Sequence, residues 1–326
     1  MKPPLAPPVL PTFDDVLDAA ARIRPHARVT PILHDPALDA LAGAELHFKC
    51  ENLQRGGSFK FRGACNAVSM LDEDAASRGV VTQSSGNHGA AIALACRLRG
   101  LRATVVVPEG APRAKLDNIA THGAGIVRCA PTMAARDAAT AALIERDGAT
   151  LIHPFDHPGV IAGQGTAALE LHTAVPGLDA LLAPVGGGGL LAGSGLACRA
   201  LRPNADLWGA EPEAACDAHD SLSAEYPITD RVPDTICDGL RGHLSARTFA
   251  LIARDASGIL LADEAGIRHA MRLLYTHLKV VVEPSSAVVL AVVLKDRQRF
   301  AGKRIGIVLS GGNVDLAGLS AMIDGD

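Results

Sequence analysis

Short apolar runs alternate with longer helix-forming runs along the chain from about residue 79 onward. The apolar runs "GVVTQSS", "ATVVVP", "GIVRC" and "ATLIHP" predict buried strands between residues 79 and 154. The segments between them predict helices, two of which end at Gly100 and Gly123. Strands and helices that alternate in this way imply a parallel sheet covered by helices on both faces.

The same alternation starts again after residue 160. Helices are predicted for "GQGTAALELHTA" and "LLAGSGLACRALRP", strands for "LDALLAPV" and "ADLWGAEP", and irregular structure for residues 212–245. The last predicted strand, "RIGIVLS", runs into "GGN" and leaves 16 residues after Ser310, too few for a further domain. We therefore expect an α/β fold with two open parallel-sheet lobes. A small lobe at 79–156 is inserted in a large lobe made of 1–78 and 157–326, and the first dozen residues form a loose, proline-broken arm.

The composition excludes several classes of protein. The net charge is −4 and only 3% of residues are aromatic, whereas a nucleic-acid-binding domain favours a basic face and stacking rings. The seven cysteines are an odd number at wide spacings without a C-x-x-C pair, which argues against a disulfide framework or a zinc site. The N-terminal segment lacks the apolar core of a signal peptide, and no uncharged run of 18 apolar residues occurs. We expect a cytoplasmic protein without a membrane span.

One lysine stands out because the chain uses 24 arginines and only 7 lysines. Lys60 lies in "GGSFKFRGA", a glycine-rich approach without acidic residues. An arginine stays protonated, whereas a desolvated lysine amine can lose its proton and attack a carbonyl carbon. The local sequence alone leaves open that Lys60 is an ordinary surface lysine.

Three turns between a predicted strand and a helix are rich in small residues: "SSGNHG" at 84–89, "VGGGGLLAG" at 185–193 and "LSGGN" at 309–313. Helix N-termini present unpaired N–H groups that bind anions, and ligands of open α/β folds collect at the carboxyl ends of strands. The three turns predict a cleft for a ligand with more than one anionic group. A plain tight turn remains the alternative for the four-glycine segment.

Two further patterns carry weaker predictions. Residues 187–192 satisfy the loose form G-x-G-x-x-A, with Asp206 near the acidic spacing of a dinucleotide site, but they lie far from the first strand of a βαβ unit. His153 and His157 have a metal-like spacing, yet Pro154 and Pro158 break any helix that would align them. We interpret both histidines as loop residues.

Five segments in this order, "GSFKFRGA", "SSGNHG", "GGGGLLAG", "VEPSSA" and "LSGGN", resemble the pyridoxal-phosphate enzymes of the serine/threonine dehydratase and serine racemase family. The resemblance covers about residues 15–320. It implies the tryptophan-synthase-β-like fold, known as fold type II, with pyridoxal 5'-phosphate in the cleft between the two lobes.

The resemblance also implies roles for individual residues. Lys60 matches the lysine that bonds the cofactor as a Schiff base and later takes the proton from Cα, which an arginine cannot do. Phe59 borders the ring, Asn87 is the partner of the 3'-hydroxyl and Ser310 is the partner of the pyridine nitrogen. The phosphate cradle matches Gly186, Gly187, Gly188, Gly189 and Leu190. The substrate carboxylate is held by the loop that contains Ser84, Ser85, Asn87 and His88.

The expected reaction follows from the neutral partner of the ring nitrogen. Ser310 does not keep that nitrogen protonated as a carboxylate would, and this favours loss of a β-hydroxyl, which gives a 2-oxo acid and ammonia. Ser85 matches the serine that supplies the second proton donor of racemases, although a helix-start serine that binds an N–H is the structural alternative. Gly242, followed by His243, replaces a serine of serine racemases, so serine preference stays open and a bulkier or acidic β-substituent could be admitted.

A divalent cation is also expected. By resemblance, the segment "AEPEAACD" supplies the carboxylates of Glu211 and Asp217 and the carbonyl of Ala215. An all-oxygen ligand set suits Mg²⁺ or Ca²⁺. Two solvated acids in a loop are the alternative.

We therefore expect a homodimeric dehydratase of L-threonine or L-serine with serine racemase side activity, and with neither nucleic acid nor membrane as a partner. The alternative within the family is a dehydratase of another β-hydroxy amino acid such as 3-hydroxyaspartate, with Arg136 and Arg241 as candidates for the extra carboxylate. From another class, a non-catalytic amino-acid-binding protein would keep the fold, but the intact Lys60 argues against it.

Overall fold

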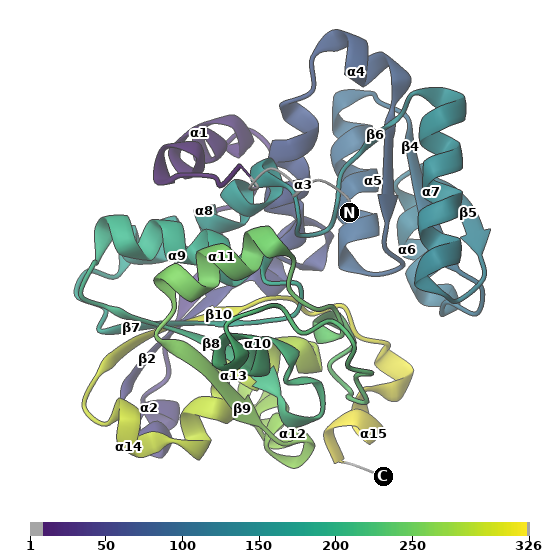
Figure 1. Cartoon of the computed structure of the whole chain (residues 1–326). Coiled ribbons are helices and arrows are strands. Elements are labelled where there is room, and N and C mark those ends of the chain that lie inside the picture. Colours follow the sequence, from purple (N-terminus) through teal and green to yellow (C-terminus); the bar gives the residue numbers. More distant parts are fainter. Residues whose placement is uncertain (1–8, 325–326) are drawn as a thin grey trace.

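The computed structural model describes residues 9–324 (Figure 1). Residues 1–8, most of the predicted loose arm, lie outside the described residues. The first helix, α1 (Phe13–Ile23), begins after Thr12, whose hydroxyl and backbone N–H exchange hydrogen bonds with Asp15 in a capping box. No helix in the range 9–324 is long and apolar enough to span a membrane.

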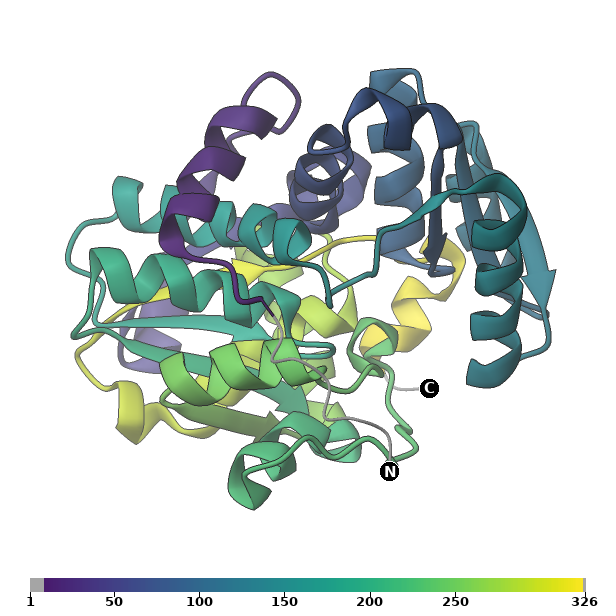
Figure 2. The ribbon, with the colours of Figure 1, turned by 45° about the horizontal axis from the view of Figure 1, so that its top comes forward.

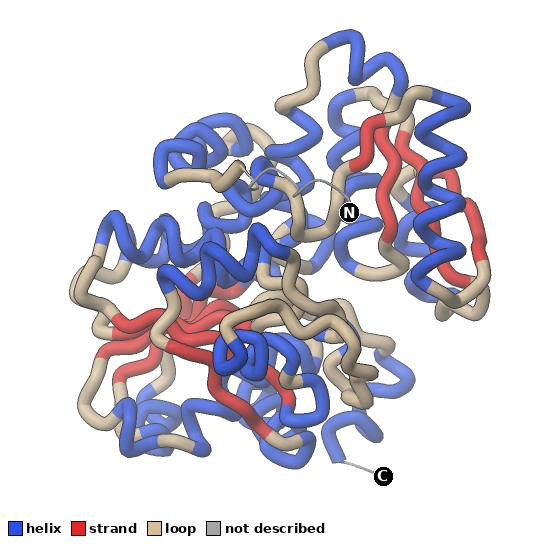
Figure 3. Tube along the Cα trace, in the orientation of Figure 1, coloured by secondary structure: helices blue, strands red, loops and turns tan. Residues whose placement is uncertain are grey.

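Two sheets organise the described chain, as Figure 3 shows. The larger sheet has the order β1-β2-β10-β7-β8-β9, and its strands are Ile32–Leu33, Glu45–Cys50, Arg304–Leu309, Ala180–Pro184, Asp206–Pro212 and Gly258–Ala262. The smaller sheet has the order β5-β4-β3-β6, with strands Gly125–Cys129, Ala103–Pro108, Val80–Gln83 and Thr150–Leu151. All neighbouring strands are parallel except β1 and β2. The predicted α/β fold with parallel sheets is confirmed.

Helices cover both faces of these sheets (Figures 1 and 2). The helices that connect the strands of the smaller sheet are α5 (Asn87–Arg99), α6 (Arg113–Thr121) and α7 (Met133–Asp147). The others are α2 (Pro36–Ala42), α3 (Lys60–Ser69), α4 (Glu73–Arg78), α8 (Pro158–Ala174), α9 (Gly189–Leu201), α10 (Asp217–Ala224), α11 (Ala246–Asp255), α12 (Glu264–Leu273), α13 (Pro284–Lys295), α14 (Arg297–Phe300) and α15 (Leu319–Asp324).

The large sheet is buried on both faces, as its apolar strands require. In β7, Ala180 and Leu182 join the apolar cluster that contains α12 and α13, while Leu181 and Ala183 join the cluster that contains α8, α9 and α11. Successive side chains of a strand point to opposite faces, so a strand that is apolar at every position needs helices on both sides.

Most predicted elements are confirmed, and two boundaries are corrected. The helices α5 and α6 end where glycine was expected to stop them, with Gly100 in the left-handed conformation at a φ of 72°. Helix α8 starts five residues before the predicted Gly163, because Pro158 is suited to the first helical position and the His157 ring accepts the Val160 N–H. The strand predicted for "ATLIHP" has only two residues, Thr150–Leu151.

The stretch 212–245 was predicted to be irregular, but it contains the helix α10. Only Asp217, Ala218 and Ser221 are buried on α10, so the helix lacks an apolar period that a sequence pattern would reveal. All four strands of the smaller sheet lie within the predicted small lobe at 79–156. The limits of the two lobes themselves stay predictions.

Candidate active site

The lysine segment is held against the turn that follows β10. The Phe59 N–H donates to the Ser310 carbonyl at 2.9 Å, and the Gly312 N–H donates to the Gly57 carbonyl at 2.9 Å. Ser58 and Gly311 form an antiparallel bridge between these hydrogen bonds. The backbone therefore brings Phe59 and Lys60 next to Ser310, although 250 residues separate Lys60 from Ser310 in the chain.

The Lys60 side chain is half-buried, and its amine lies between a carbonyl oxygen and an aromatic ring. Its Nζ atom donates a hydrogen bond to the Pro154 carbonyl at 3.1 Å and lies 5.1 Å from the centre of the Phe59 ring. Burial lowers the pKa of Lys60 to about 8, against the opposing effect of the Glu283 carboxylate. A fraction of this amine is therefore neutral near pH 7, as a nucleophile or base requires. Lys60 is not an ordinary surface lysine.

The four-glycine turn joins β7 to α9 and has no room for side chains. A β-carbon at Gly187 would lie 2.2 Å from Cδ1 of Phe155, and one at Gly188 would lie 2.7 Å from Cδ2 of Leu244. Gly188 also has a φ of 84°, and α9 starts without a side-chain cap. The N–H groups at the start of α9 are thus free of local side-chain partners, and a phosphate fits such a cradle. Leu190, in the first turn of α9, is buried in the apolar cluster beneath it.

The loop "SSGNHG" joins β3 to α5. The Ser84 hydroxyl accepts the Gly86 N–H at 3.3 Å, and α5 begins without a side-chain cap. Within residues 9–324 the Ser85 hydroxyl makes no hydrogen bond, so Ser85 does not satisfy a helix-start N–H. The first N–H groups of α5 and the Ser85 hydroxyl are therefore free to meet a carboxylate.

His88 is buried behind this loop. Its Nε2 atom lies 3.3 Å from the Ile152 carbonyl, so Nε2 carries the proton and donates, and Nδ1 has no partner among the described residues. Burial, followed by the charge of Lys60, lowers the pKa of His88 well below its usual value. The ring is neutral and its one N–H is committed, so His88 can offer a carboxylate only its backbone N–H at the start of α5.

Glu283 and Asn313, to which the sequence motifs assign no role, complete the site. The amide nitrogen of Asn87 donates to both carboxyl oxygens of Glu283, at 3.0 and 3.1 Å, and its oxygen accepts from Asn313 at 2.8 Å. Glu283 belongs to "VEPSSA" and Asn313 to "LSGGN", so both were inside the recognised segments. Their contacts with Asn87 span 196 and 226 residues, which no local pattern reveals.

The arginines and other specificity candidates occupy different surroundings. Arg136, in the first turn of α7, has a buried Nε without a partner in the described chain, and the neighbouring Asp137 accepts from Gln83 at the end of β3. The Arg241 guanidinium instead donates to the Thr235 carbonyl at 2.7 Å. Gly242 lies beside the four-glycine turn, because a β-carbon there would be 3.7 Å from the Gly187 nitrogen and from the Phe155 ring.

The structure excludes the weaker patterns. Asp206 lies at the start of β8, the end opposite the four-glycine turn, and pairs with Lys303 at 3.2 Å. A dinucleotide would need this acid near the turn, so the fingerprint is accidental. His153 accepts the Asp156 N–H at 3.0 Å, and His157 caps α8, so neither histidine is a metal ligand aligned on a helix.

The predicted cation site is a buried acidic pair after β8. Glu211 is fully buried, and its carboxylate accepts the N–H groups of Ala218 and His219 at 3.1 and 2.8 Å. Asp217 has a buried carboxyl oxygen without a partner in the described residues. Burial raises the pKa of Asp217 to about 6 and, together with the charge of Asp217, raises that of Glu211 well above its usual range.

These residues suit a hard cation. The acids are not solvated, and the unpartnered oxygen of Asp217 would gain a ligand. Ala215, between them in the chain, is buried. Within the described part of the chain no three His, Cys, Asp or Glu side chains come close enough to hold a metal together, so backbone carbonyl and water oxygens would have to complete the shell.

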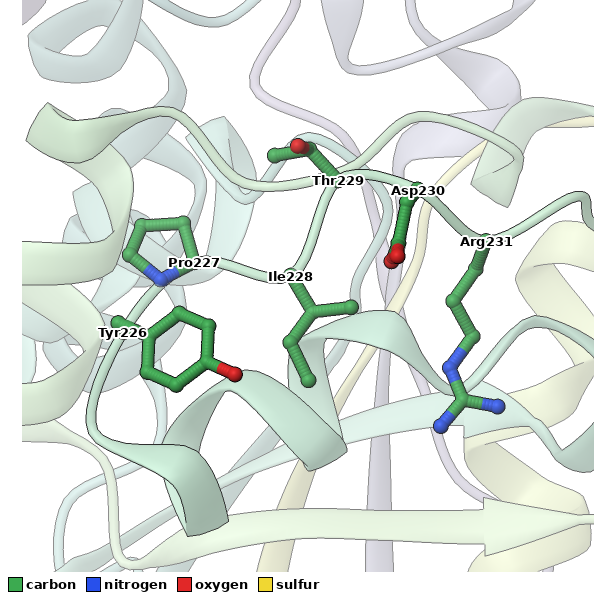
Figure 4. Close-up of a pocket in the computed structure, with 6 residues that line it drawn as sticks. All are labelled: Tyr226, Pro227, Ile228, Thr229, Asp230 and Arg231. Atoms are coloured by element: carbon green, nitrogen blue, oxygen red, sulfur yellow. The ribbon is translucent and has the colours of Figure 1, made fainter.

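A cavity of about 640 Å³ lies elsewhere, inside the loop of residues 226–231 that follows α10 (Figure 4). Its lining is Tyr226, Pro227, Ile228, Thr229, Asp230 and Arg231, and Arg231 forms an ion pair with Asp220. None of the predicted site residues lines this cavity.

The chain was compared with known proteins. Residues 23–311 match the family described as pyridoxal-phosphate dependent enzyme. The chain is 46% identical over 317 residues to a serine racemase of Dictyostelium discoideum, covering 96% of this chain and 98% of that protein. It is 47% identical over 307 residues to a beta-hydroxyaspartate dehydratase of Paracoccus denitrificans, covering 94% and 98%.

Solved structures agree with these relatives. The Dictyostelium discoideum serine racemase structure has a TM-score of 0.91 over 94% of this chain and 99% of that chain, at 46% identity. A threonine deaminase structure, from T.th., has a TM-score of 0.89 over 94% and 99%, at 42% identity. The predicted fold of type II enzymes is confirmed.

Proposed function

The chain belongs to the pyridoxal-phosphate dependent enzyme family, and we propose that it is an ammonia-lyase that converts a β-hydroxy amino acid into a 2-oxo acid and ammonia. L-Threonine and L-serine are the first candidate substrates, and racemisation of serine is a second reaction of the same site. Relatives named serine racemase and L-threo-3-hydroxyaspartate ammonia-lyase, the latter of Saccharomyces cerevisiae, support both reaction types.

The observation that carries this proposal is the half-buried Lys60 amine, which lies against the Pro154 carbonyl and the Phe59 ring and has its pKa lowered to about 8. Pyridoxal phosphate, when bound, would supply an electron sink for Cα of the substrate amino acid. Lys60 then holds and moves the Cα proton, because its amine is partly neutral and half-buried. The N–H groups of Gly186–Gly189 and Leu190 would hold the phosphate, and Phe59 would border the ring. Asn87 and Ser310 would be the partners of the ring oxygen and the ring nitrogen.

The loop of residues 84–88 orients the substrate carboxylate. The unpaired hydroxyl of Ser85 is our candidate for the second proton donor, on the face of Cα opposite Lys60. Such a donor is needed for racemisation, whereas elimination from an L-amino acid needs only Lys60.

A substrate with a second carboxylate is the alternative, and Arg136 favours it. The buried Nε of Arg136 lacks a partner within residues 9–324, and a charged donor in that state gains from an anion. The relatives from Paracoccus denitrificans and Saccharomyces cerevisiae act on hydroxyaspartate by name. Arg241 is a weaker candidate because its guanidinium already binds the Thr235 carbonyl.

We further propose that Glu211, Asp217 and the Ala215 carbonyl bind Mg²⁺ or Ca²⁺ as a structural ion, supported by the buried acidic pair and the unpartnered Asp217 oxygen. The protein is also proposed to be a cytoplasmic homodimer. In support of a dimer, Val29 is 80% exposed, Tyr275 55%, Leu53 42% and Val281 40%. The Asn52 side chain, next to Leu53, donates to the Val281 carbonyl, and Arg28, next to Val29, donates to the Leu53 carbonyl. Val29, Leu53 and Val281 therefore lie near one another as an exposed apolar patch.

One assay tests the proposed function. The purified holoenzyme is incubated with L-serine, D-serine, L-threonine and the isomers of 3-hydroxyaspartate, and 2-oxo acid release is measured together with the chirality of the remaining amino acid. Release of a 2-oxo acid from at least one substrate is expected. A protein that binds these amino acids but releases no 2-oxo acid and no D-serine would instead be an amino-acid-binding protein.

A further inference from the structure

Glu283 is a buried carboxyl group whose side chain turns away from its own helix and contacts helix α5. It occupies the N-cap position of α13, yet its side chain makes no cap hydrogen bond with that helix. Only 6% of the residue is exposed. Both carboxyl oxygens instead accept from the Asn87 amide of α5, a helix that covers the other sheet.

Gly311 makes room for this carboxyl group, and Gly239 borders it. A β-carbon at Gly311 would lie 2.9 Å from Oε1 of Glu283 and 3.1 Å from Oε2, and one at Gly239 would lie 3.7 Å from Oε1. Gly311 follows Ser310, whose carbonyl accepts the Phe59 N–H. The carboxyl group therefore occupies a defined space beside the turn that holds the lysine segment.

The contact fixes the orientation of the Asn87 amide. Its nitrogen end faces the Glu283 carboxyl and its oxygen end faces the Asn313 amide, which also donates to the Gly56 carbonyl at 2.8 Å. If the amide were turned over, its oxygen would face the Glu283 oxygens and its nitrogen would face the Asn313 nitrogen. Neither pair could form a hydrogen bond, so the amide has one stable orientation.

Three charged groups face Glu283 from the elements packed around it. They are Lys60 at the start of α3, Lys115 of α6 and Asp238 of the turn Asp238–Leu240. Lys115 and Asp238 pair with each other and so join α6 to the turn Asp238–Leu240. Lys60 donates to the Pro154 carbonyl and forms no direct ion pair with Glu283, yet the Glu283 carboxylate raises the pKa of Lys60 against the effect of burial.

We propose that Glu283 is a positioning residue of the active site, which fixes the Asn87 amide and is the counter-charge of the Lys60 amine. Burial, opposed by the Asn87 hydrogen bond, raises the pKa of Glu283 to about 7. Near pH 8, where Lys60 titrates, the Glu283 carboxyl group is therefore mostly ionised, and its negative charge can stabilise the ammonium form of Lys60. The inference rests on the proposed function only in taking Lys60 as the reactive amine.

The test measures the Lys60 amine without cofactor or substrate. Apoprotein is labelled with acetic anhydride at pH values from 6 to 10, and acetylation of the Lys60 peptide is measured by mass spectrometry against the exposed Lys295 as internal reference. Glu283→Gln removes the charge but keeps an oxygen that accepts from Asn87. The midpoint of Lys60 labelling is expected to shift downward in this variant, because the ammonium form loses a stabilising charge.

Two further variants separate charge from structure. Asp238→Asn removes a second carboxylate near Glu283, one whose charge does not shift the pKa of Lys60. The midpoint pH of Lys60 labelling in this variant is therefore expected to match that of the native protein. Gly311→Ala keeps every charge but places a methyl group against the Glu283 carboxyl, and it is expected to weaken cofactor binding and move the pH at which the bound cofactor changes its absorption spectrum.

An unchanged or raised Lys60 midpoint in Glu283→Gln, or an equal downward shift in Asp238→Asn, would overturn the proposal. A native spectrum and cofactor affinity in Gly311→Ala would refute the positioning of Asn87. Because the labelling involves no substrate, these results are independent of the substrate assay, and a failure there would refute the proposed function alone.

Discussion

Replacing Gly187 by alanine tests whether the packing of Phe155 shapes the phosphate cradle. The added β-carbon would lie 2.2, 2.3 and 2.4 Å from three ring atoms of Phe155, where ordinary contact begins near 3.4 Å. The φ of Gly187 is not in the left-handed region, so the clash is the only penalty. The ring or the turn must move by about 1 Å, and overpacking of this kind typically costs about 1–3 kcal/mol.

A double-mutant cycle measures this clash. We expect Gly187→Ala to destabilise the apoprotein in urea unfolding by about 1–3 kcal/mol and to raise the Kd of pyridoxal phosphate about tenfold. In the Phe155→Ala background the same change should cost almost nothing, which gives a coupling energy of about 1–3 kcal/mol. Gly242→Ala is the matched control, because its β-carbon meets the same ring at 3.7 Å and should change stability by about 0.5 kcal/mol or less. Additive effects in the cycle would refute the reasoning.

Four further outcomes are expected. Lys60→Ala should bind the cofactor weakly and release no 2-oxo acid, and near-normal release would contradict the assignment. Ser85→Ala should keep elimination from L-substrates but lose racemisation by about 10²–10⁴-fold, judged by chiral chromatography, and a parallel loss of both would mean that Ser85 only shapes the loop. Chelation should lower the unfolding temperature of the native protein but not that of Asp217→Asn, because a cation bound only to the folded state stabilises it. Equal responses of the two proteins would refute the cation site. Burial lowers the pKa of His172 from 6.5 to about 4, so between these pH values the unfolded chain binds more protons at this residue than the folded chain does. The free energy of unfolding should therefore fall as the pH drops from about 6.5 to 4, by up to about 3 kcal/mol. His172→Leu should flatten this part of the urea-unfolding pH profile, and an unchanged slope would refute the prediction.

The sequence was sufficient for those parts of the fold that local patterns determine. The strand β4 is a run of apolar residues and α5 ends at a glycine, so period and stop signals locate them. Helix α10 was missed because tertiary contacts bury it without an apolar period. The start of α8 was missed although Pro158 and the preceding His157 are a visible start signal.

The candidate site shows the same division. Lys60 and the glycine turns were visible because each combines an unusual residue type with a predicted strand end. Glu283 and Asn313 were not assigned a role, because their partner is Asn87, about 200 residues away, and only the packing of the two sheets brings them together. The state of His88 depends on the Ile152 carbonyl, which no motif contains.

The chemistry of the site is divided between the elements of the two sheets, and this division has a consequence for substrate choice. Lys60 and the phosphate cradle follow β2 and β7 of the larger sheet, whereas the carboxylate loop at 84–88 and Arg136 follow strands of the smaller one. Elimination and racemisation both require the Cα proton of the substrate to lie at the Lys60 amine, while the substrate carboxylate is held from the other side. The distance between these two groups is therefore set by the contacts that join the sheets' helices and turns. The contact of Asn87 with Glu283 has a buried carboxyl group, whereas the pair Lys115 to Asp238 is half-exposed. A buried contact resists change more than an exposed ion pair does. Variation of the exposed pair can thus adjust the spacing of these groups to a longer or shorter β-substituent, while the contact with the buried Glu283 keeps Asn87 fixed.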